Sequence, residues 1–395
     1  MIMSHVVPTL TNMGVDVIDL GLATTPTIEL AVINFGASGG IIITASHNPI
    51  EWNGLKFLNA QGEFITSEHG LRMMEYAESE TLSAEPVKTV GTHGQADFLD
   101  EHIRAILALA LVRRDLISAK GFTIAVDAVN SVGGTAIPAL LKALGVQRVI
   151  EVNCEPTGMF AHNPEPLPEH LTDLSKTVIE HHADIGISVD PDVDRMALVC
   201  EDGSMFGEEY GLVAVSDYVL SHTLGNTVSN LSSTRALKLV TQERGGEYFP
   251  AAVGEVNVVK RMKEVDAVIG GEGNGGIIYP KLHYGRDALA GVALFLSALA
   301  ESDLRTSELR KRYPFDVIAK KKVELNGEPG AALERVRRAF TDQPKDETDG
   351  IRLEFGKDWV HIRPSNTEPI MRIYAESGNA ESAEQLAQRV MSVLR

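Results

Sequence analysis

Ser46 and His47 lie in a polar stretch, residues 44–49, directly after the apolar run 41–43. An apolar, β-branched run bounded by glycines predicts a buried strand, and open α/β sheets bind ligands beyond the carboxyl ends of their strands. A serine hydroxyl held there beside an imidazole and backbone N–H groups suits a group that reacts or carries a phosphate. Taken alone, the stretch is equally consistent with a polar turn, because Ser, Asn and Pro favour turns.

Asp190, Asp192 and Asp194 alternate along the segment after a second apolar run, residues 185–189. Ligands that are all oxygen suit a hard cation such as Mg²⁺ or Ca²⁺, and a cation would relieve the repulsion among the carboxylates. Arg195 next to them is a natural phosphate contact. An EF-hand calcium loop is disfavoured, because Arg195 stands at the sixth position, where that loop needs glycine. An acidic surface turn is the remaining alternative.

A glycine-rich run, residues 270–276, follows a third apolar segment and contains Glu272 and Asn274. Glycines let a backbone approach a ligand closely, and a carboxylate with an amide is a common pairing for binding sugar hydroxyls. The G-x-G-x-x-G spacing of dinucleotide-binding loops is absent from this run. The pattern is weak by itself, because glycine-rich loops are common.

A fourth polar cluster lies between two predicted strands and offers a guanidinium, hydroxyls and an amide, which are donors for a phosphate. Its members are Arg363, Ser365, Asn366 and Thr367. Lys56, on the strand that returns after Ser46, could donate or accept a proton if neighbouring groups lowered its pKa. A polar hairpin loop and a solvated lysine are the structural alternatives.

Three stretches of the chain repeat one order of elements, which is strand, helix, strand, polar loop, strand and turn. Alternating apolar strands and amphipathic helices predict mainly parallel α/β layers. We therefore expect an α/β protein with three related mixed α/β domains around a cleft and a C-terminal α+β domain; a single large sheet is the alternative. The predicted boundaries are 1–98 with the serine loop, 99–218 with the aspartates, 219–312 with the glycine-rich loop, and 313–395 with the Arg363 cluster.

The formal net charge of −18 argues against binding to nucleic acid or to an anionic membrane surface. The longest apolar stretches, residues 105–112 and 288–300, are too short to span a bilayer, and the second predicts a buried helix. Two cysteines, Cys154 and Cys200, favour a reducing compartment. With no signal-peptide pattern in residues 1–10, we expect a cytoplasmic protein.

Taken together, the four loops resemble the α-D-phosphohexomutase superfamily, which includes phosphoglucomutase/phosphomannomutase and phosphoglucosamine mutase. The motifs at residues 44–49, 190–195, 271–276 and 363–369 occur in the order of that family and extend over nearly the whole chain. Four ordered motifs are far more specific than any one of them.

The resemblance implies a role for each loop. Ser46 would be the phosphoserine, held with Mg²⁺ by the three aspartates, while His47, Lys56 and Arg195 surround the transferring group. Glu272 and Asn274 would bind sugar hydroxyls. The distal phosphate of the substrate would be bound by Arg363, Ser365, Asn366 and Thr367.

The implied reaction interconverts the 1- and 6-phosphates of glucose or mannose through a hexose 1,6-bisphosphate, which also serves as activator. Phosphoglucosamine mutase activity is one alternative and a phosphatase another. Members of the family begin with a strand and a Gly-Thr-Ser/Asp-Gly-x-Arg-Gly motif that does not precede Ser46, so a chain that binds sugar phosphate without turnover is a further alternative. We expect a phosphosugar partner and a monomer or homodimer.

Overall fold

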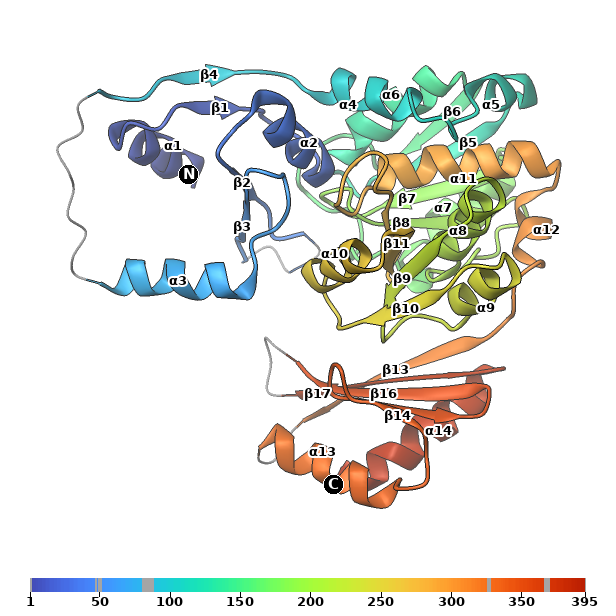
Figure 1. Ribbon diagram of the computed structural model, residues 1–395. Coiled ribbons are helices and arrows are strands. Elements are labelled where there is room, and N and C mark those ends of the chain that lie inside the picture. The colour runs from blue at the N-terminus through green and yellow to red at the C-terminus, as the bar shows by residue number, and fades with distance from the viewer. Residues whose placement is uncertain are drawn as a thin grey trace. The chain divides into compact units, whose positions relative to one another are not determined.

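The computed structural model describes residues 2–46, 48, 52–79, 89–324, 328–365 and 370–394 (Figure 1). The chain divides into two compact units. The first comprises Met1–Gly211 and Gly275–Ser307, and the second comprises Leu212–Asn274 and Glu308–Arg395.

The first unit begins with a small α/β region built on two short sheets. Its elements are α1 (Met3–Asn12), β1 (Val17–Asp19), α2 (Thr25–Phe35), β2 (Gly40–Ile43), β3 (Leu55–Leu58), α3 (Ser67–Glu78) and β4 (His93–Gln95). Strand β1 pairs with β4 in parallel, and β2 pairs with β3 antiparallel. The Thr24 side chain caps α2 by accepting the N–H of Thr27, and Gly36 ends the helix in the left-handed conformation. The serine loop therefore connects β2 to β3.

The larger part of the first unit is a four-stranded sheet in the order β6-β5-β7-β8. Its elements are α4 (Leu99–Leu107), α5 (Arg114–Lys120), β5 (Thr123–Asp127), α6 (Gly133–Leu144), β6 (Arg148–Val152), the 3-10 helix η1 (Pro168–His170), α7 (Thr172–Glu180), β7 (Ile185–Val189) and β8 (Met196–Cys200). Strand β5 is parallel to β6 and β7, whereas β8 returns antiparallel to β7. Every residue of β7 and β8 is buried, as their unbroken apolar sequences predict.

A second segment of the chain completes this unit. It contributes β12 (Gly276–Ile278) and α11 (Ala288–Ser302), and α12 (Thr306–Arg310) follows. Helix α11 is buried from Ala288 to Ala300, which confirms the buried helix that the sequence predicts there. Asp287 caps its first turn by accepting the N–H of Ala290.

The second unit starts with a parallel sheet centred on β9. Helix α8 (Tyr210–His222) leads into β9 (Asn226–Asn230), α9 (Ala236–Glu243), β10 (Tyr248–Ala251), α10 (Glu255–Glu264) and β11 (Ala267–Glu272). Both β10 and β11 run parallel to β9. Strand β11 is longer than the predicted apolar run and reaches Glu272, so Gly270 and Gly271 belong to the strand. A Cβ on Gly270 would lie 2.7 Å from the Val228 carbonyl oxygen, which is why the strand needs glycine there.

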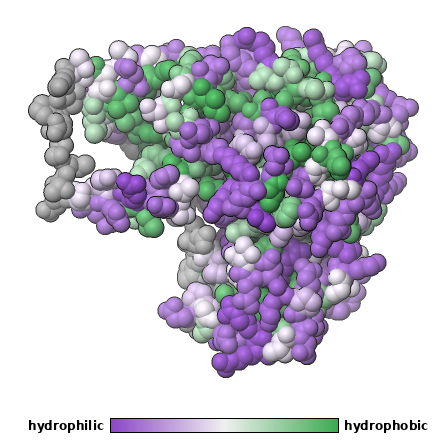
Figure 2. All heavy atoms as spheres, viewed as in Figure 1, coloured by the Kyte–Doolittle hydropathy of each residue, from purple (hydrophilic) through white to green (hydrophobic). Residues whose placement is uncertain are grey.

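The C-terminal domain is a five-stranded antiparallel sheet with two helices on one face (Figure 1). Its elements are β13 (Val317–Glu324), α13 (Pro329–Ala339), β14 (Lys345–Asp346), β15 (Ile351–Phe355), β16 (Asp358–Pro364), β17 (Ile370–Ser377) and α14 (Ala380–Leu394). The strand order is β13-β17-β16-β15-β14. Strand residues such as Ile362 and Ile373 form its core together with Val390 of α14, and the surface seen in Figure 2 is mostly hydrophilic over this domain.

These elements confirm the expected class of three related α/β regions followed by an α+β domain. Within the part of the chain that the structure describes, no helix is both long and apolar enough to cross a membrane. The structure adds strand β4, which the sequence pattern does not indicate, because all three of its residues are exposed and none is strongly apolar.

Candidate active site

Ser46 lies at the carboxyl end of β2 in a strained backbone conformation. Its φ is +48°, in the left-handed region that non-glycine residues rarely adopt. The Thr44 hydroxyl holds this turn by accepting the N–H of Ser46 at 2.9 Å. The Ser46 Oγ lies 3.3 Å from Asp190 Oδ2, although the two residues are 144 positions apart in the chain. The fold therefore brings the predicted serine and the first aspartate together.

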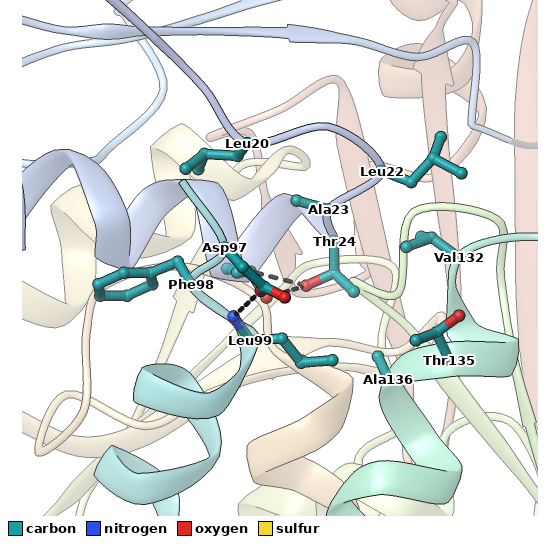
Figure 3. A pocket seen from close by; sticks show the side chains of 11 residues that line it. Leu20, Leu22, Ala23, Thr24, Asp97, Phe98, Leu99, Val132, Thr135 and Ala136 are labelled. Atoms are coloured by element: carbon teal, nitrogen blue, oxygen red, sulfur yellow. Dashed lines mark hydrogen bonds between the residues drawn. The ribbon is translucent and has the colours of Figure 1, made fainter. Parts of the chain in front are cut away.

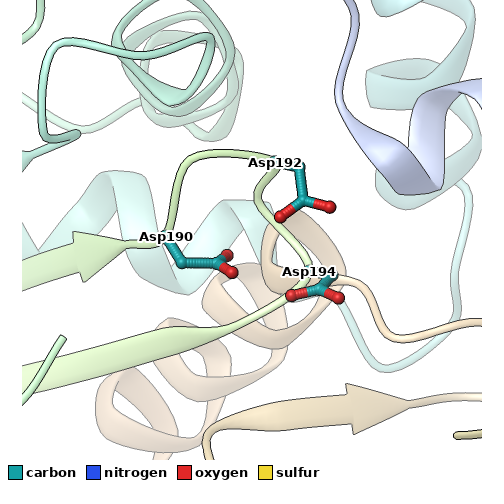
Figure 4. A group of neighbouring side chains, drawn as sticks. All are labelled: Asp190, Asp192 and Asp194. Carbon is teal, nitrogen blue, oxygen red and sulfur yellow. The ribbon is translucent and has the colours of Figure 1, made fainter. Parts of the chain in front are cut away.

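Residues 190–195, which we call the acidic loop, connect β7 to β8. The carboxylates of Asp190, Asp192 and Asp194 converge (Figure 4), and one oxygen from each lies within 4.8 Å of the others. All three side chains are buried. Val193 between them has a φ of +63°, an outlier for a β-branched residue, and is fully buried. The flanking elements are strands and not helices, so the loop is not an EF-hand.

Each carboxylate of the acidic loop has at least one basic side chain against it. Arg195 contacts Asp190 through Nε at 3.0 Å, and its own backbone N–H donates to the other oxygen of Asp190. The Lys56 Nζ lies 2.6 Å from Asp192 Oδ2. Arg286 Nη2 lies 2.5 Å from Asp194 Oδ2. No local sequence pattern marks Arg286, because it follows Asp194 by 92 positions and belongs to no recognisable motif.

These contacts set the charge state of the loop. Burial raises the pKa of Asp190 well above its ordinary value, and repulsion from Asp194 and Asp192 adds to this against the attraction of Arg195. Burial also opposes ionisation of Asp194, but Arg286, Lys56 and Arg195 outweigh it and lower the pKa of Asp194. Burial opposes the charge of Lys56 too, yet Asp192 and Asp194 raise its pKa. The carboxylates next to Lys56 therefore favour its protonated form.

The acidic loop fits a divalent cation. Asp192 Oδ1 and Asp194 Oδ1 are both buried, and neither accepts a hydrogen bond from any residue that the structure describes. Buried carboxylate oxygens without a donor are costly unless a cation binds them. An all-oxygen donor set is what Mg²⁺ prefers. The repulsion that raises the pKa of Asp190 is also the repulsion that a bound cation would remove.

Helix α2 also contacts the acidic loop, through Thr25 in its first turn. The Thr25 backbone N–H donates to the Asp192 carbonyl oxygen at 2.9 Å, and its hydroxyl donates to Asp192 Oδ2 at 2.8 Å. Ala288, at the start of α11, donates its N–H to the Val193 carbonyl oxygen at 3.2 Å. Only tertiary structure brings these partners together, so no local sequence signal marks them.

In the second unit, Glu272 ends β11 and is held by neighbouring groups. Its Oε1 accepts from Asn230 Nδ2 at 2.8 Å and from the Gly254 N–H at 3.0 Å. Asn230 is itself tied to the Ser233 hydroxyl. Asn274 is half-buried two residues beyond Glu272. Asn230 and Ser233 thus support Glu272, although no local sequence pattern marks either residue.

Arg363 lies near the end of β16, and its cross-strand neighbour on β17 is Arg372, whose own neighbour on β13 is Lys322. Like charges opposite one another are unfavourable unless an anion lies between them. The Arg363 Nε is buried and has no hydrogen-bond partner among the residues that the structure describes. Ser365 donates its N–H to the Ile370 carbonyl oxygen, which brings the two strands together at this end. His47, Asn366 and Thr367 lie outside the described residues.

The structure also contains a small pocket in the first unit, and none of its lining residues belongs to the acidic loop (Figure 3). Its lining is mainly apolar, with Leu20, Phe98 and Val132 among the residues. Its carboxylate, Asp97, accepts the N–H of Leu99, the first residue of α4. The pocket therefore offers little polar chemistry.

Four family models match the chain in succession. They describe phosphoglucomutase/phosphomannomutase alpha/beta/alpha domain I over residues 1–83, domain II over 100–203, domain III over 207–315, and the C-terminal domain over 319–393. A probable phosphoglucosamine mutase of Thermococcus kodakarensis is 36% identical over 98% of this chain and 85% of its own length. The chain belongs to the α-D-phosphohexomutase superfamily. As a phosphohexomutase, it is an isomerase that acts as an intramolecular phosphotransferase.

Two further matches place this phosphohexomutase among its relatives. A phosphoglucomutase/phosphomannomutase of the same archaeon is 33% identical over 95% of this chain and 83% of its own. A phosphoglucomutase/phosphomannomutase family protein from Burkholderia thailandensis has a similar crystal structure, with a TM-score of 0.82 and 27% identity. That match covers 98% of this chain and 84% of the solved one. Relatives of similar identity thus carry names for different hexose substrates.

Proposed function

We propose that this chain interconverts the 1- and 6-phosphates of a hexose, with Ser46 as the phosphoryl carrier. The supporting observation is the serine hydroxyl 3.3 Å from Asp190, in a loop of three buried carboxylates that are each paired with a base. Phosphoryl transfer needs in-line positioning and charge neutralisation more than it needs covalent chemistry. The strained turn at Ser46 provides the positioning, and the basic side chains around the acidic loop provide the charge neutralisation.

The proposed reaction moves one phosphoryl group in each direction. The bond between phosphorus and Ser46 Oγ breaks as the oxygen of a substrate hydroxyl bonds to phosphorus, and the proton of that hydroxyl is transferred so that Ser46 Oγ becomes a neutral hydroxyl. The product of this step is the hexose 1,6-bisphosphate. In the second step, Ser46 Oγ attacks the other phosphate of the bisphosphate, the bond between that phosphorus and its sugar oxygen breaks, and the serine proton is transferred to the sugar oxygen that leaves. The serine is then phosphorylated again, and the phosphate has changed its position on the sugar.

The residues of the chain have separate roles in this proposal. Asp190, Asp192 and Asp194 would hold Mg²⁺, which supplies positive charge next to the oxygens of the transferring group. Lys56 stays protonated beside Asp192, and Arg195 fixes Asp190. His47 is proposed to stand beside the transferring group. The phosphate that is not transferred is proposed to bind Arg363, Ser365, Asn366 and Thr367, with Arg372 as an additional cation.

The preferred hexose is glucose or mannose in this proposal, with glucosamine as the second candidate. Glu272 and Asn274 are proposed to bind sugar hydroxyls. The second candidate has direct support, because relatives with 36% and 33% identity are named probable phosphoglucosamine mutases. A coupled assay with glucose 1-phosphate, mannose 1-phosphate and glucosamine 1-phosphate, each primed with the matching 1,6-bisphosphate, distinguishes the two by kcat/KM.

The phosphoserine is tested with the variant Ser46→Ala. We expect label from a hexose 1,6-bisphosphate on Ser46 of the wild-type protein, no label in the variant, and turnover at least about 10³-fold lower. Ser392→Ala, which alters an exposed serine on α14, should behave like the wild type. Release of free phosphate faster than formation of the 6-phosphate would indicate a phosphatase instead. Labelling of the Ser46→Ala variant would contradict the role of Ser46.

A further inference from the structure

A second polar cluster is buried in the first unit, apart from the carboxylates of the acidic loop. It comprises Glu29 of α2, His102 of α4, and His283 and Asp287 ahead of α11. The exposed fractions are 1% for Glu29, 0% for His102, 6% for His283 and 1% for Asp287. We call it the His283 cluster. Nothing in the proposed chemistry uses these four side chains directly.

Asp287 is the centre of the His283 cluster. Its Oδ2 lies 2.9 Å from His102 Nε2 and 3.2 Å from His283 Nε2, while its Oδ1 accepts the N–H of Ala290. The other ring nitrogen of His283 lies 3.2 Å from Glu29 Oε2. One carboxylate therefore ties the start of α11 to α4 and, through His283, to α2.

A chain of hydroxyl groups extends the cluster to the first turn of α2. His102 Nδ1 lies 2.9 Å from the Thr27 hydroxyl, which lies 2.6 Å from the Thr24 hydroxyl. Thr24 is the residue that caps α2. The cluster therefore fixes the starts of two helices: Thr24 holds the start of α2, and Asp287 holds the start of α11.

The residues next to Thr24 and Asp287 in the chain contact the acidic loop directly. Thr25 follows Thr24 and makes two hydrogen bonds to Asp192. Arg286 and Ala288 flank Asp287 and contact Asp194 and the Val193 carbonyl oxygen. A shift of either helix start would thus move a direct partner of the acidic loop.

The charges of the cluster argue for a positioning role. Burial opposes protonation of His283, but its contacts with Asp287 and Glu29 outweigh burial and raise its pKa to about 10. Buried ion pairs are weak evidence for stability, because desolvation offsets much of the attraction between the charges. Their best-attested use is to fix one arrangement of the elements that carry them. Glycine at 285 supports this geometry, because a Cβ there would lie 1.8 Å from Glu29 Oε2.

We propose that the His283 cluster positions the acidic loop for cation binding by fixing the start of α2 and the start of α11. This inference rests on the proposed cation site of the mutase. The members of the His283 cluster are positioning residues that act on the acidic loop through Thr25 and Arg286. Residues that hydrogen-bond directly to metal ligands, as Thr25 does to Asp192, typically change metal affinity about 10-fold to 100-fold when they are altered, so we expect the lower end of this range for the His283 cluster.

Two near-isosteric variants with opposite charge changes test the proposal. Asp287→Asn removes a negative charge, and His283→Gln removes a positive one. If the cluster acted only through its long-range field, Asp287→Asn would weaken cation binding and His283→Gln would strengthen it. A positioning role predicts that both variants weaken it, about tenfold or more. Isothermal titration with Mg²⁺, and Mn²⁺ titration followed by electron paramagnetic resonance, measure the affinity without turnover.

Ser297→Ala is the matched control, because Ser297 is fully buried on the same helix α11 and bonds to Arg113, far along the helix from Asp287. It should lower the Tm and leave the affinity for Mg²⁺ unchanged. The proposal is overturned if Asp287→Asn and His283→Gln behave like this control. It is also overturned if the two variants change the affinity in opposite directions.

The hydroxyl groups of Thr27 and Thr24, which connect His102 to the start of α2, supply a second test should either variant fail to fold. Thr27→Val keeps the shape of the side chain and removes the hydroxyl, whereas Thr27→Ser keeps the hydroxyl. We expect weaker Mg²⁺ binding in the first and near-normal binding in the second; equal affinities would refute the positioning role. Asp190→Asn separates this inference from the proposed function. If that variant loses the cation while the cluster variants keep it, the cation site stands and only the cluster's role fails.

Discussion

At the scale of single residues, the acidic loop is a balanced set of charges. Asp190, Asp192 and Asp194 each contact at least one basic side chain, so the loop can be buried before a cation binds. Burying like charges together without such partners would cost several kcal/mol for each ion. The same basic groups are placed to neutralise a phosphoryl group, so one arrangement supports both folding and transfer.

Lys56→Met tests this balance, because it should change binding and turnover in opposite directions. Removing the cation beside Asp192 makes the loop more negative, so we expect Mg²⁺ to bind about tenfold more tightly. Turnover should fall about 10²-fold, because the transferring group loses a fixed positive charge. Lys120→Met is the control, since it removes the same charge from an exposed pair with Asp303. Weaker Mg²⁺ binding in Lys56→Met would show that Lys56 positions the loop instead of balancing it.

The candidate residues that the sequence revealed are those with a local pattern. Asp190, Asp192 and Asp194 stand two positions apart after an apolar run, so spacing alone brings them together. Thr25 and Arg286 have no such pattern, because they reach the loop from segments 167 and 92 positions away. Spacing also could not show that the neighbours of Lys56 raise its pKa, since that depends on which charges surround it in the fold.

At the scale of elements, the strands were predictable wherever burial makes them continuously apolar. Strand β7 has the bounds of the predicted apolar run, residues 185–189, for this reason. Strand β11 extends past its apolar run to Glu272, because glycines pack against the chain's own strands and give no apolar signal. The glycines that the sequence suggested for ligand approach thus also serve packing.

Two adjacent glycines after β11 should separate packing from function. A Cβ on Gly275, whose φ is +90°, would lie 2.2 Å from the Met196 carbonyl oxygen, so Gly275→Ala should lower the free energy of unfolding by about 2 kcal/mol or more. A Cβ on Gly276 would lie 2.3 Å from Arg286 Cδ, a flexible side chain that can move away. Gly276→Ala should therefore keep most of the stability but displace Arg286 from Asp194 and reduce turnover. Urea unfolding and kcat measured on both variants check this, and equal losses of stability would contradict it.

At the scale of the whole molecule, each compact unit contains a buried histidine in the opposite charge state. His283 of the first unit is held protonated between Asp287 and Glu29, with a pKa of about 10. His361 of the second unit receives the Ser232 hydroxyl at Nδ1 and donates from Nε2 to the Asp349 carbonyl oxygen, which suits a neutral ring. Burial lowers the pKa of His361 to about 4, helped by the charges of Arg352 and Arg363 against that of Asp349.

These two histidines should limit stability at opposite ends of the pH range. An unfolded histidine titrates near 6.5, so the contribution of His283 is complete below that pH and is lost as pH rises toward 10. The folded state around His361 binds fewer protons than the unfolded chain, so stability is retained above 6.5 and lost as pH falls toward 4. Alkaline pH should therefore weaken the first unit and acidic pH the second.

Calorimetry of the wild type, His283→Gln and His361→Gln across this pH range tests the assignment. We expect His283→Gln to lower Tm at neutral pH. Its Tm should then fall less than that of the wild type as pH rises toward 10, because the titrating group has been removed. His361→Gln should flatten the decline on the acidic side only, since an amide can accept from Ser232 at every pH. The comparison with each variant cancels the pH-dependent repulsion that a net charge of −18 brings to the whole chain. If each variant changed the acidic and the alkaline decline of Tm equally, stability would depend on that overall charge and not on these two buried histidines.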